Sequence, residues 1–380
     1  MKKIYFPGLN GVRFIAAFLV MVDHTELFKY RFGHTTLWAN SYSSFLGASG
    51  VTIFFVLSGF LITYLLLTEK EAQPINIKHF YIRRILRIWP LYYFIVALCF
   101  FVVPHLGFFE VPGYVTGTDQ FGERLFLFSA LLANVAFVYY PVVAFANILW
   151  SVAVEEQFYL FWPHVIKRTK QLLHVFLILI LVYLVIKLSV YFWDSNHKLN
   201  AVIFRTRFSS MIIGAIGAYM VFRKSSVLRW VYHWSFQLIT IGAFVILMGR
   251  MIRNEYFDLV GNEVFSLVVC LLIVNIATNK KTVLKLENAV FNYLGKISYG
   301  LYVYHLFAVT LVVKFIAPAL GLKKLSSVAE YPIVIGSVLI ITVAISHLSY
   351  FYFEKPILRK KIKFSSILSG DLVERSSSKT

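Results

Sequence analysis

The sequence predicts an all-α membrane protein: a polytopic helix bundle of about ten transmembrane helices, one re-entrant or interfacial segment, and both termini in the cytoplasm. Composition is the first observation behind this prediction. Of the 380 residues, 59% are hydrophobic and 14% are charged, and the mean hydropathy is +0.73, whereas soluble domains carry about 25% charged residues. This balance excludes a soluble multidomain protein, a disordered chain and a disulfide scaffold.

Recurring apolar stretches are the second observation. A stretch of about 20 residues crosses a hydrocarbon core of about 30 Å at the helical rise. One integral membrane domain over residues 1–356 is predicted, and residues 357–380 are predicted to be a basic, disordered cytoplasmic tail. The predicted spans are residues 9–28, 47–68, 85–105, 147–166, 172–193, 204–222, 230–250, 257–277, 297–317 and 331–353.

The distribution of Lys and Arg decides whether an eleventh stretch, 124–140, also crosses. If it does not cross and the N-terminus is cytoplasmic, 24 Lys and Arg lie inside and 11 outside; if it crosses, the split becomes 15 and 20. Because basic residues concentrate on the cytoplasmic side, 124–140 is predicted to be re-entrant or interfacial. The net charge of +19 fits basic loops facing an anionic membrane surface, so no nucleic-acid partner is expected.

The first predicted helix carries two ionisable groups on one face. Such groups cost about 2.5–3.5 kcal/mol each inside a bilayer and therefore mark candidate functional sites. Arg13 and His24 are eleven positions apart, which places them on one face and about 16 Å apart along the helix axis. Asp23 lies beside His24 and is a candidate to orient it. In the alternative interpretation, Arg13 reaches the interface and His24 only ends the helix.

Three arginines open the third predicted helix, in the run HFYIRRILRIWPLYY. Arg84 and Arg87 are i, i+3 neighbours, and Arg83 and Arg87 are i, i+4 neighbours. Guanidinium groups bind phosphates in a forked geometry that lysine does not offer. The run therefore predicts a phosphate-binding site, with ordinary positive-inside topology as the alternative.

Two adjacent carboxylates lie in NILWSVAVEEQFYLFWP. If this helix starts outside, Glu155 and Glu156 lie about 12–14 Å into the bilayer. Neighbouring side chains point to different sides of a helix, so at least one carboxylate is predicted to face the bundle interior. The alternative is an interhelical salt bridge, for instance to Arg205 or Arg207.

The run LGKISYGLYVYHLF places Ser298, Tyr302 and His305 on one helix face, at i, i+4 and i+7. They could support a site or bind substrate; the alternative for His305 is a buried, hydrogen-bonded core histidine. Gly50, Ser58 and Gly59, in GASGVTIFFVLSGFLIT, fit close helix packing without chemistry. Neither a metal site nor a tightly bound cofactor is predicted.

Taken together, these runs resemble the acyltransferase-3 family of integral membrane O-acyltransferases. The resemblance extends from about residue 5 to residue 356 and rests on five runs in order: LNGVRFIAAFLVMVDH, GVTIFFVLSGFLIT, FYIRRILRIWPLYY, LWSVAVEEQFYLFWP and ISYGLYVYHL. The family's Arg-x10-His motif corresponds to Arg13 and His24. Its RxxR motif corresponds to Arg84 and Arg87, and its WS-x-x-x-E-E segment to Glu155 and Glu156.

The resemblance implies transfer of an acyl group, usually acetyl from cytosolic acetyl-CoA, to a hydroxyl of a cell-envelope carbohydrate or lipid-linked glycan. The expected location is the cytoplasmic membrane, in contact with lipid. Many relatives append an extracytoplasmic hydrolase-like domain; this chain ends soon after its tenth predicted span, so a separate protein would have to take that part.

Within such an enzyme, His24 is expected to be the general base, because the pKa of histidine, about 6.5, suits proton transfer near neutral pH. An acyl-histidine intermediate stays open. Arg83, Arg84 and Arg87 are expected to bind the acyl-CoA. Arg13 would guide the pantetheine arm or polarise the thioester, and Glu155 or Glu156 would bind acceptor hydroxyls or tune the histidine.

Two rival functions share many of these features. A transporter or flippase for lipid-linked glycans would also have buried charges and a basic cytoplasmic face, but no inverted repeat is evident. A glycan polymerase or ligase would be expected to carry a large outer loop, and the longest predicted outer segment, 106–146, is partly apolar and poor in charge.

Overall fold

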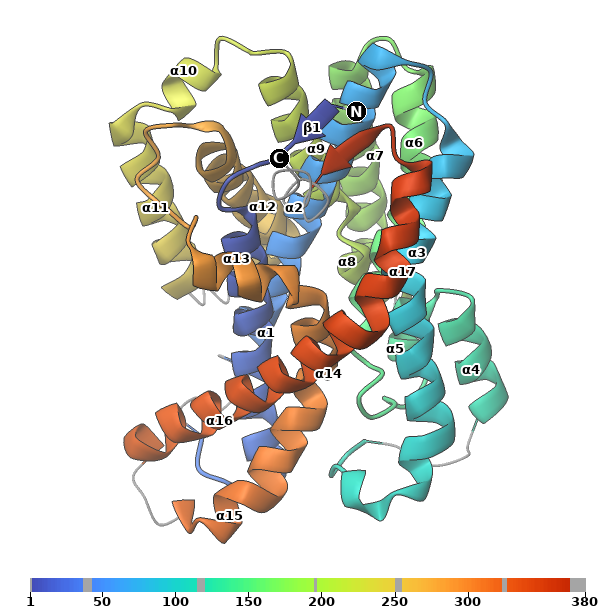
Figure 1. Cartoon of the computed structure of the whole chain (residues 1–380), viewed down its shortest axis with the longest axis vertical. Coiled ribbons are helices and arrows are strands. Elements are labelled where there is room, and N and C mark those ends of the chain that lie inside the picture. Colours follow the sequence, from blue (N-terminus) through green and yellow to red (C-terminus); the bar gives the residue numbers. More distant parts are fainter. Residues whose placement is uncertain are drawn as a thin grey trace.

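The computed structural model describes residues 2–36, 43–114, 120–194, 197–249, 255–322 and 327–369. About four fifths of these residues are helical (Figure 1). The helices are α1 (Leu9–Arg31), α2 (Ser43–Ala72), α3 (Ile77–Ala97), α4 (Phe121–Ser129), α5 (Ala133–Tyr139), α6 (Leu149–Arg168), α7 (Leu172–Trp193), α8 (Lys198–Thr206), α9 (Phe208–Phe222), α10 (Leu228–Val231), α11 (Trp234–Gly249), α12 (Glu255–Thr278), α13 (Ala289–Lys296), α14 (Ser298–Leu311), α15 (Ala317–Ala319), α16 (Ser327–Leu348) and α17 (Lys355–Lys360).

Shorter elements extend or follow several of these helices. Two short strands, β1 and β2, pair in parallel near the two ends of the chain. The short segments are η1 (Leu98–Val102), η2 (Val103–His105), η3 (Gly107–Phe109), η4 (Val312–Ile316), η6 (Ser349–Glu354), η7 (Lys361–Phe364), β1 (Lys2–Ile4) and β2 (Ile367–Ser369).

Seven helical segments in the described ranges are long and apolar enough to cross a membrane. They match seven of the ten predicted spans: Phe45–Ala72, Ile77–His105, Leu172–Trp193, Lys198–Phe222, Leu259–Thr278, Ser298–Ala319 and Ala329–Phe364. The other three predicted spans correspond to α1, α6 and α11, of 23, 20 and 16 residues. The protein is therefore a multi-pass membrane protein, while the count of ten and the cytoplasmic position of the ends stay predictions.

The stretch 124–140 is not one continuous helix. It is divided between α4 and α5, of 9 and 7 residues, which are about 14 and 11 Å long at the helical rise. Neither can cross a core of about 30 Å alone. Gln157 of α6 donates to the Leu131 carbonyl between them, at 2.8 Å. This arrangement agrees with the prediction of a re-entrant or interfacial element.

α2 packs closely against α1 and α9. A Cβ atom on Gly59 would lie 1.9 Å from the carbonyl oxygen of Met211 in α9, and one on Gly50 would lie 2.5 Å from the carbonyl oxygen of Ala16 in α1. Neither position leaves room for a side chain, so small residues allow these backbones to touch. The prediction of close packing at Gly50 and Gly59 is confirmed.

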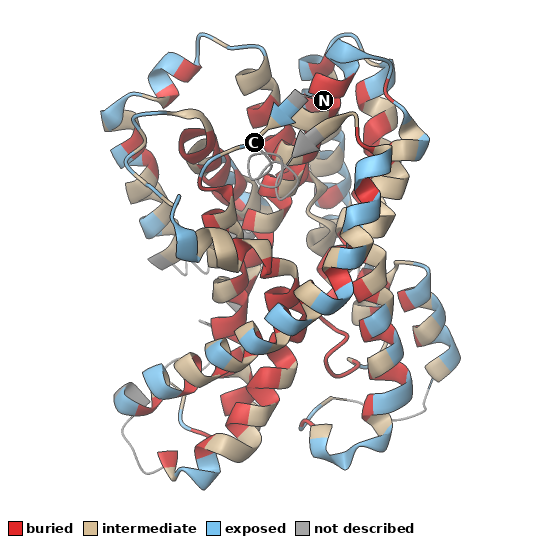
Figure 2. Cartoon of the chain, in the orientation of Figure 1, coloured by how far each residue is buried: buried red, intermediate tan, exposed pale blue. Residues whose placement is uncertain are grey.

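α7 shows how the outer surface is adapted to lipid. Many of its large apolar side chains are exposed, among them Leu177, Leu181 and Val185, whereas buried residues concentrate in helices such as α1 and α14 (Figure 2). Exposed apolar side chains would be unfavourable in water and are compatible with a hydrocarbon environment. The composition of α7 therefore follows from the membrane and not from a buried core.

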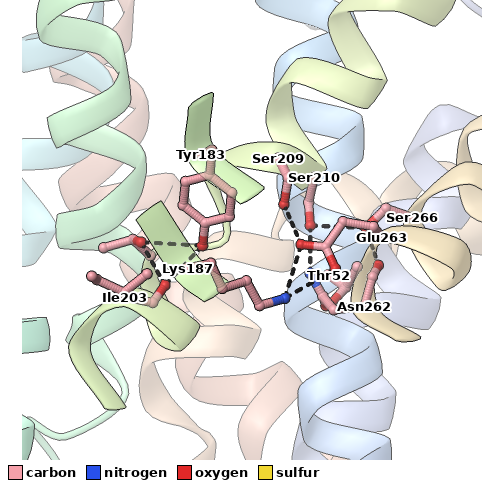
Figure 3. Close-up of polar contacts among 10 residues, drawn as sticks. Thr52, Tyr183, Lys187, Ile203, Ser209, Ser210, Asn262, Glu263 and Ser266 are labelled. Carbon is pink, nitrogen blue, oxygen red and sulfur yellow. Dashed lines mark hydrogen bonds and ion pairs between the residues drawn. The ribbon is translucent and has the colours of Figure 1, made fainter. Parts of the chain in front are cut away.

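The one lysine of that helix turns inward. Lys187 is 2% exposed, and its Nζ lies 3.0 Å from Oε2 of Glu263 in α12. Figure 3 shows the hydroxyl of Ser209 on the same carboxylate, at 2.8 Å. Next to this ion pair, Thr52, Ser210, Asn262 and Ser266 form a second set of hydrogen bonds between α2, α9 and α12. An intramembrane ion pair of this kind ties α7 to the bundle.

The two strands place both ends of the described chain at the same end of the molecule (Figure 1). Lys3 of β1 is in register with Leu368 of β2. The predicted tail, 357–380, therefore differs from the expectation of disorder as far as Ser369, because α17, η7 and β2 fold back beside β1. Residues 370–380 lie outside the described residues.

Glu287, in the connection between α12 and α13, holds the start of α1 at this end. Its carboxylate accepts hydrogen bonds from the Tyr5 hydroxyl, from the Gly8 amide at 2.5 Å and from Asn292 Nδ2 at 2.8 Å. Burial raises the pKa of Glu287, but these three hydrogen bonds together lower it more, so the pKa lies below its ordinary value. The contact fixes Tyr5 and its neighbours at the mouth of the tunnel described next.

Candidate functional site

A narrow tunnel of about 210 Å³ enters the bundle from the end that carries β1 and β2. Its inner wall is built from α1, α2, α3, α6 and α14. Leu65, the α2 lining residue nearest the mouth, and Val51, the deepest one, are 14 positions apart, or about 21 Å at the helical rise. Compact ligand pockets measure about 300–1,000 Å³, so the tunnel suits an extended chain better than a compact molecule.

Two of the three clustered arginines line this tunnel, and Arg13 joins them from α1. Arg84 and Arg87 face it from α3. The Arg84 guanidinium lies 5.8 Å from the ring centroids of both Phe80 and Tyr159, which is within cation–π range. Arg13 donates to Asn10 Oδ1 at 2.8 Å, one helical turn before it. The tunnel lining therefore carries three positive charges, from α1 and α3.

Arg83 points elsewhere. Its Nη2 lies 2.8 Å from Glu69 Oε2, and its Nη1 donates to the Phe364 carbonyl at 2.7 Å. It lies on a smaller neighbouring cavity of about 30 Å³. The three arginines that the sequence groups together are thus divided: Arg84 and Arg87 face the tunnel, and Arg83 anchors the C-terminal segment.

The two glutamates of α6 diverge, as expected for adjacent positions. Glu155 lines the tunnel and accepts from the Tyr159 hydroxyl at 3.0 Å. Glu156 accepts from Trp89 Nε1 at 2.8 Å on another side of the helix, and its Oε1 atom is buried with no hydrogen bond from a described residue. The prediction that at least one carboxylate faces the interior is confirmed by Glu155.

The alternative partners considered for these glutamates bond to other groups. Arg207 donates from Nη1 to the Ala48 carbonyl and to Thr52 Oγ1, both at 2.8 Å. It does so from the break between α8 and α9, where its own φ is +41°, a left-handed conformation that is strained for a residue with a side chain. Arg205 lies 4.8 Å from the Phe137 ring centroid. The alternative interpretation, a salt bridge from either arginine to Glu155 or Glu156, is therefore wrong.

Tyr302 and Ser151 lie at the far end of the tunnel. The Tyr302 hydroxyl donates to the Ile148 carbonyl at 3.0 Å and lies 2.7 Å from Ser151 Oγ. Ser298, one turn earlier on α14, lines the same wall. These contacts hold the α14 face, which the sequence placed at Ser298, Tyr302 and His305, against the start of α6.

Beyond Tyr302 lies a pair of histidines from α1 and α14. His24 Nδ1 is 2.8 Å from His305 Nε2, and His305 Nδ1 is 2.6 Å from the Tyr302 carbonyl oxygen. The ring planes differ by 11°, with centroids 5.0 Å apart, so the rings meet edge to edge through the N···N contact. His305 is 0% exposed, and His24 is half-buried.

The carboxylates beside His24 face other partners. Asp23 packs against α2, where a Cβ on Gly47 would lie 2.5 Å from its Oδ2 atom. Glu26 lies 3.8 Å from Lys29, which is 3.4 Å from Glu330 of α16. The group in hydrogen-bonding contact with the His24 ring is thus His305, and Asp23 does not take the orienting position suggested for it.

Although their spacing places Arg13 and His24 on one helix face, the two side chains do not line one cavity. Arg13 is on the tunnel wall, whereas His24 is not among the lining residues and Tyr302 stands between. The reason is that α1 runs past the end of the tunnel. The tunnel is instead connected to His24 through α14, in which Tyr302 at the end of the tunnel lies one turn before His305.

The polar lining residues that the sequence analysis did not identify as candidates include Ser58, Tyr159, Lys296 and Lys361. Tyr159 is i+4 from Glu155, a spacing that could have identified it. Ser58, which pairs with the Tyr159 hydroxyl, sits in an apolar run that suggested packing only. Lys361 belongs to the predicted tail, and no local pattern shows that this segment folds back over the tunnel.

Comparison with known proteins places these residues in context. The peptidoglycan O-acetyltransferase OatA of Listeria monocytogenes is 33% identical over 171 residues, covering 43% of this chain and 24% of that protein. The O-acetyltransferase OatA and a putative O-acetyltransferase of Staphylococcus aureus are each 24% identical, covering 96% and 95% of this chain and 59% of each relative. No solved structure matches.

The chain thus spans about three fifths of the length of the staphylococcal relatives and a quarter of the listerial one. The acyltransferase-3 family, which is described as an acyltransferase domain, matches residues 6–347. That range holds the tunnel arginines, Glu155 and both histidines of the pair. Because the match covers most of the sequence, the chain belongs to the acyltransferase-3 family.

Proposed function

We propose that the protein transfers an acyl group, acetyl in the first instance, from cytosolic acyl-CoA to a hydroxyl of a cell-envelope carbohydrate. The observation that carries this proposal is the continuous connection from a basic tunnel to a histidine pair. The tunnel wall ends at Tyr302, whose carbonyl contacts His305, which contacts His24. The proposed location is the cytoplasmic membrane, with the tunnel mouth on the cytosolic side.

The tunnel would bind the donor as an extended chain. A pantetheine arm is about as long as five extended peptide residues, roughly 17 Å, and the tunnel wall extends about 21 Å by the helical rise. Arg84 and Arg87 would pair with the phosphates, and Lys296 and Lys361 add positive charge to the tunnel lining. Arg13 lies about 16 Å from His24 along α1, which favours guiding the arm over polarising the thioester.

Glu155 has a separate role in this proposal. A carboxylate among arginines would repel phosphates if it lay at the mouth. Glu155 instead lies one helical turn, about 6 Å at the helical rise, from Ser151 at the far end of the tunnel. There its oxygen atoms can accept from an amide N–H of the pantetheine arm. Glu156, which is bonded to Trp89, would hold α3 and α6 in place.

The chemical step needs a base that takes the proton of the acceptor hydroxyl and then gives a proton to the leaving thiolate. His24 takes the proton of the acceptor hydroxyl as its oxygen bonds to the thioester carbonyl carbon. The tetrahedral intermediate then collapses, the C–S bond breaks, and the thiolate takes the proton from His24 to leave as free CoA. Tyr302 lies between the tunnel and the histidines, so transfer requires its side chain to rotate away.

The acceptor class is proposed from the relatives and from the chemistry. One relative is named for peptidoglycan and all three for O-acetyl transfer, so an envelope carbohydrate that contacts the bundle from the side opposite the tunnel mouth is the best-supported acceptor. Because the relatives are longer than this chain, a further domain or protein could complete the transfer.

Radiolabelled acetyl-CoA tests the proposal directly. Membranes containing the full chain are incubated with [14C]acetyl-CoA, and label is counted in the glycan fraction. We expect label with the wild type and none with His24→Ala at equal protein level. The matched control is His347→Ala, because His347 is exposed and bonds Tyr293 away from the tunnel, at 2.6 Å.

Any other result of the labelling experiment contradicts a specific part of the proposed function. Label that survives His24→Ala contradicts the base assignment. Absence of label in glycan with the wild type contradicts the transferase, and movement of lipid-linked glycan across vesicles without acyl-CoA would favour a flippase.

A further inference from the structure

His305 lies at the centre of a chain of two hydrogen bonds that ends on the proposed base. A carbonyl oxygen only accepts hydrogen bonds, so His305 Nδ1, at 2.6 Å from the Tyr302 carbonyl, must carry a proton. A neutral imidazole carries one N–H, which leaves His305 Nε2 as an acceptor. His24 Nδ1, 2.8 Å away, must then be the donor. The remaining nitrogen, His24 Nε2, has no proton.

The alternative is a doubly protonated His305, which would reverse the second bond and put the proton on His24 Nε2. That alternative requires a buried positive charge. His305 is 0% exposed, and within the described ranges no carboxylate forms an ion pair with it. An unpaired buried charge is strongly unfavourable, so the neutral form, and with it the direction of both bonds, is favoured.

We propose that His305 is a positioning residue that fixes His24 in the tautomer with Nδ1 protonated, leaving Nε2 as the atom that takes the acceptor proton. This inference rests on the proposed function, in which His24 is the base. His24 Nε2 is suited to the role because His24 is half-buried, and this atom has no hydrogen-bond partner among the residues that the structure describes. The base is therefore oriented from the donor side of the bundle.

The same contact supports the charged state of His24 during transfer. When Nε2 takes a proton, the Nδ1–H···Nε2 hydrogen bond to His305 becomes charge-assisted and stronger. His305 in this respect takes the place that a carboxylate has in a Ser-His-Asp triad, as a neutral acceptor. Its own orientation is held by the Tyr302 carbonyl, which belongs to the backbone of α14 and stays in place when the Tyr302 side chain rotates.

Two substitutions separate the acceptor from the ring that carries it. Gln at 305 can place an amide oxygen where Nε2 lies and can still accept from His24. Asn at 305 reaches only the Nδ1 position, where it can bond the Tyr302 carbonyl but not His24. We expect His305→Asn to lower kcat roughly 10- to 100-fold with the KM for acetyl-CoA unchanged, and His305→Gln to retain most of the wild-type kcat.

The assay is [14C]acetyl transfer to membrane glycan by the full-length protein, with His347→Gln as the unaffected histidine control. Equal losses in the Gln and Asn variants, or no loss in either, would overturn the proposal. A raised KM for acetyl-CoA together with a smaller amount of folded protein would indicate a structural role and would also overturn the proposal. If the wild type transfers no label, or if His24→Ala is fully active, the proposed function fails first.

Nitrogen NMR of ¹⁵N-histidine-labelled protein in bilayers measures the tautomer without any turnover. The His24 signals, identified by their loss in His24→Ala, should show protonated Nδ1 and bare Nε2 in the wild type and in His305→Gln. A mixture of tautomers is expected in His305→Asn. A wild-type His24 protonated at Nε2 would refute the inference even if the enzyme acylates glycan through His24.

Discussion

Arg83 and Arg84 are adjacent in α3 and carry the same charge, but only Arg84 faces the tunnel. Replacing Arg84 with Lys keeps the charge and removes the forked donor set. A hydrogen bond to a charged group contributes about 1.5–3 kcal/mol. Because Lys keeps one donor, we expect the lower value, about 1.5 kcal/mol, to be lost. This weakens CoA binding about 12-fold, since about 1.4 kcal/mol is a factor of ten.

Isothermal titration of CoA into the purified full-length protein measures this change directly, without the kinetic terms that enter KM. Arg83→Lys is the matched control: its guanidinium is bonded to Glu69 and the Phe364 carbonyl, so its Kd should change much less. Equal weakening in both variants would refute the reasoning that the tunnel is the donor site. So would an unchanged Kd for Arg84→Lys.

Three further predictions concern packing and charge. Gly59→Ala should destabilise the protein by about 1–3 kcal/mol, because the added Cβ would overlap α9. The control Gly336→Ala should not, because no described atom lies within 4 Å of a Cβ at that position. Thermal unfolding in detergent compares the two variants. Lys187→Met should destabilise by about 3–5 kcal/mol, because Glu263, whose side chain is 12% exposed, would keep its hydrogen bond from Ser209 but lose its counter-charge. A Lys187→Met/Glu263→Gln double variant should recover part of the loss; equal stability of both variants would contradict an ion pair. Glu287 has a lowered pKa, so its stabilising contribution is present above its ordinary pKa and is lost as pH falls through the lowered value. The free energy of unfolding measured from pH 6 to 3 should therefore fall less steeply in Glu287→Gln than in the wild type. Identical pH slopes of the two proteins would count against the hydrogen bonds.

Much of the site follows from short patterns in the sequence. The depth of Arg13, His24 and Glu155 in apolar helices marks them as candidates, because a charge in lipid needs a reason. The i, i+4, i+7 spacing correctly places Ser298, Tyr302 and His305 on one side of α14. Close packing at Gly50 and Gly59 was also readable, since small residues in an apolar run indicate touching backbones.

Other parts of the site depend on rotation and long-range folding. Spacing treats Arg83, Arg84 and Arg87 alike, but the packing of α3 turns Arg83 toward Glu69 and Phe364. Asp23 is the sequence neighbour of His24, yet it faces Gly47. The folded C-terminal segment, with Lys361 on the tunnel wall, had no local signal, because its partner strand is at the other end of the chain.

The sequence by itself determines that this chain is a membrane helix bundle with a few ionisable side chains at defined depths, because hydropathy and helical period are local properties. Which atoms meet was decided by the tertiary structure. His24 and His305 are 281 positions apart, and their contact depends on how α1 and α14 are rotated against each other. That rotation is set by the packing of side chains from other helices, which no single segment encodes.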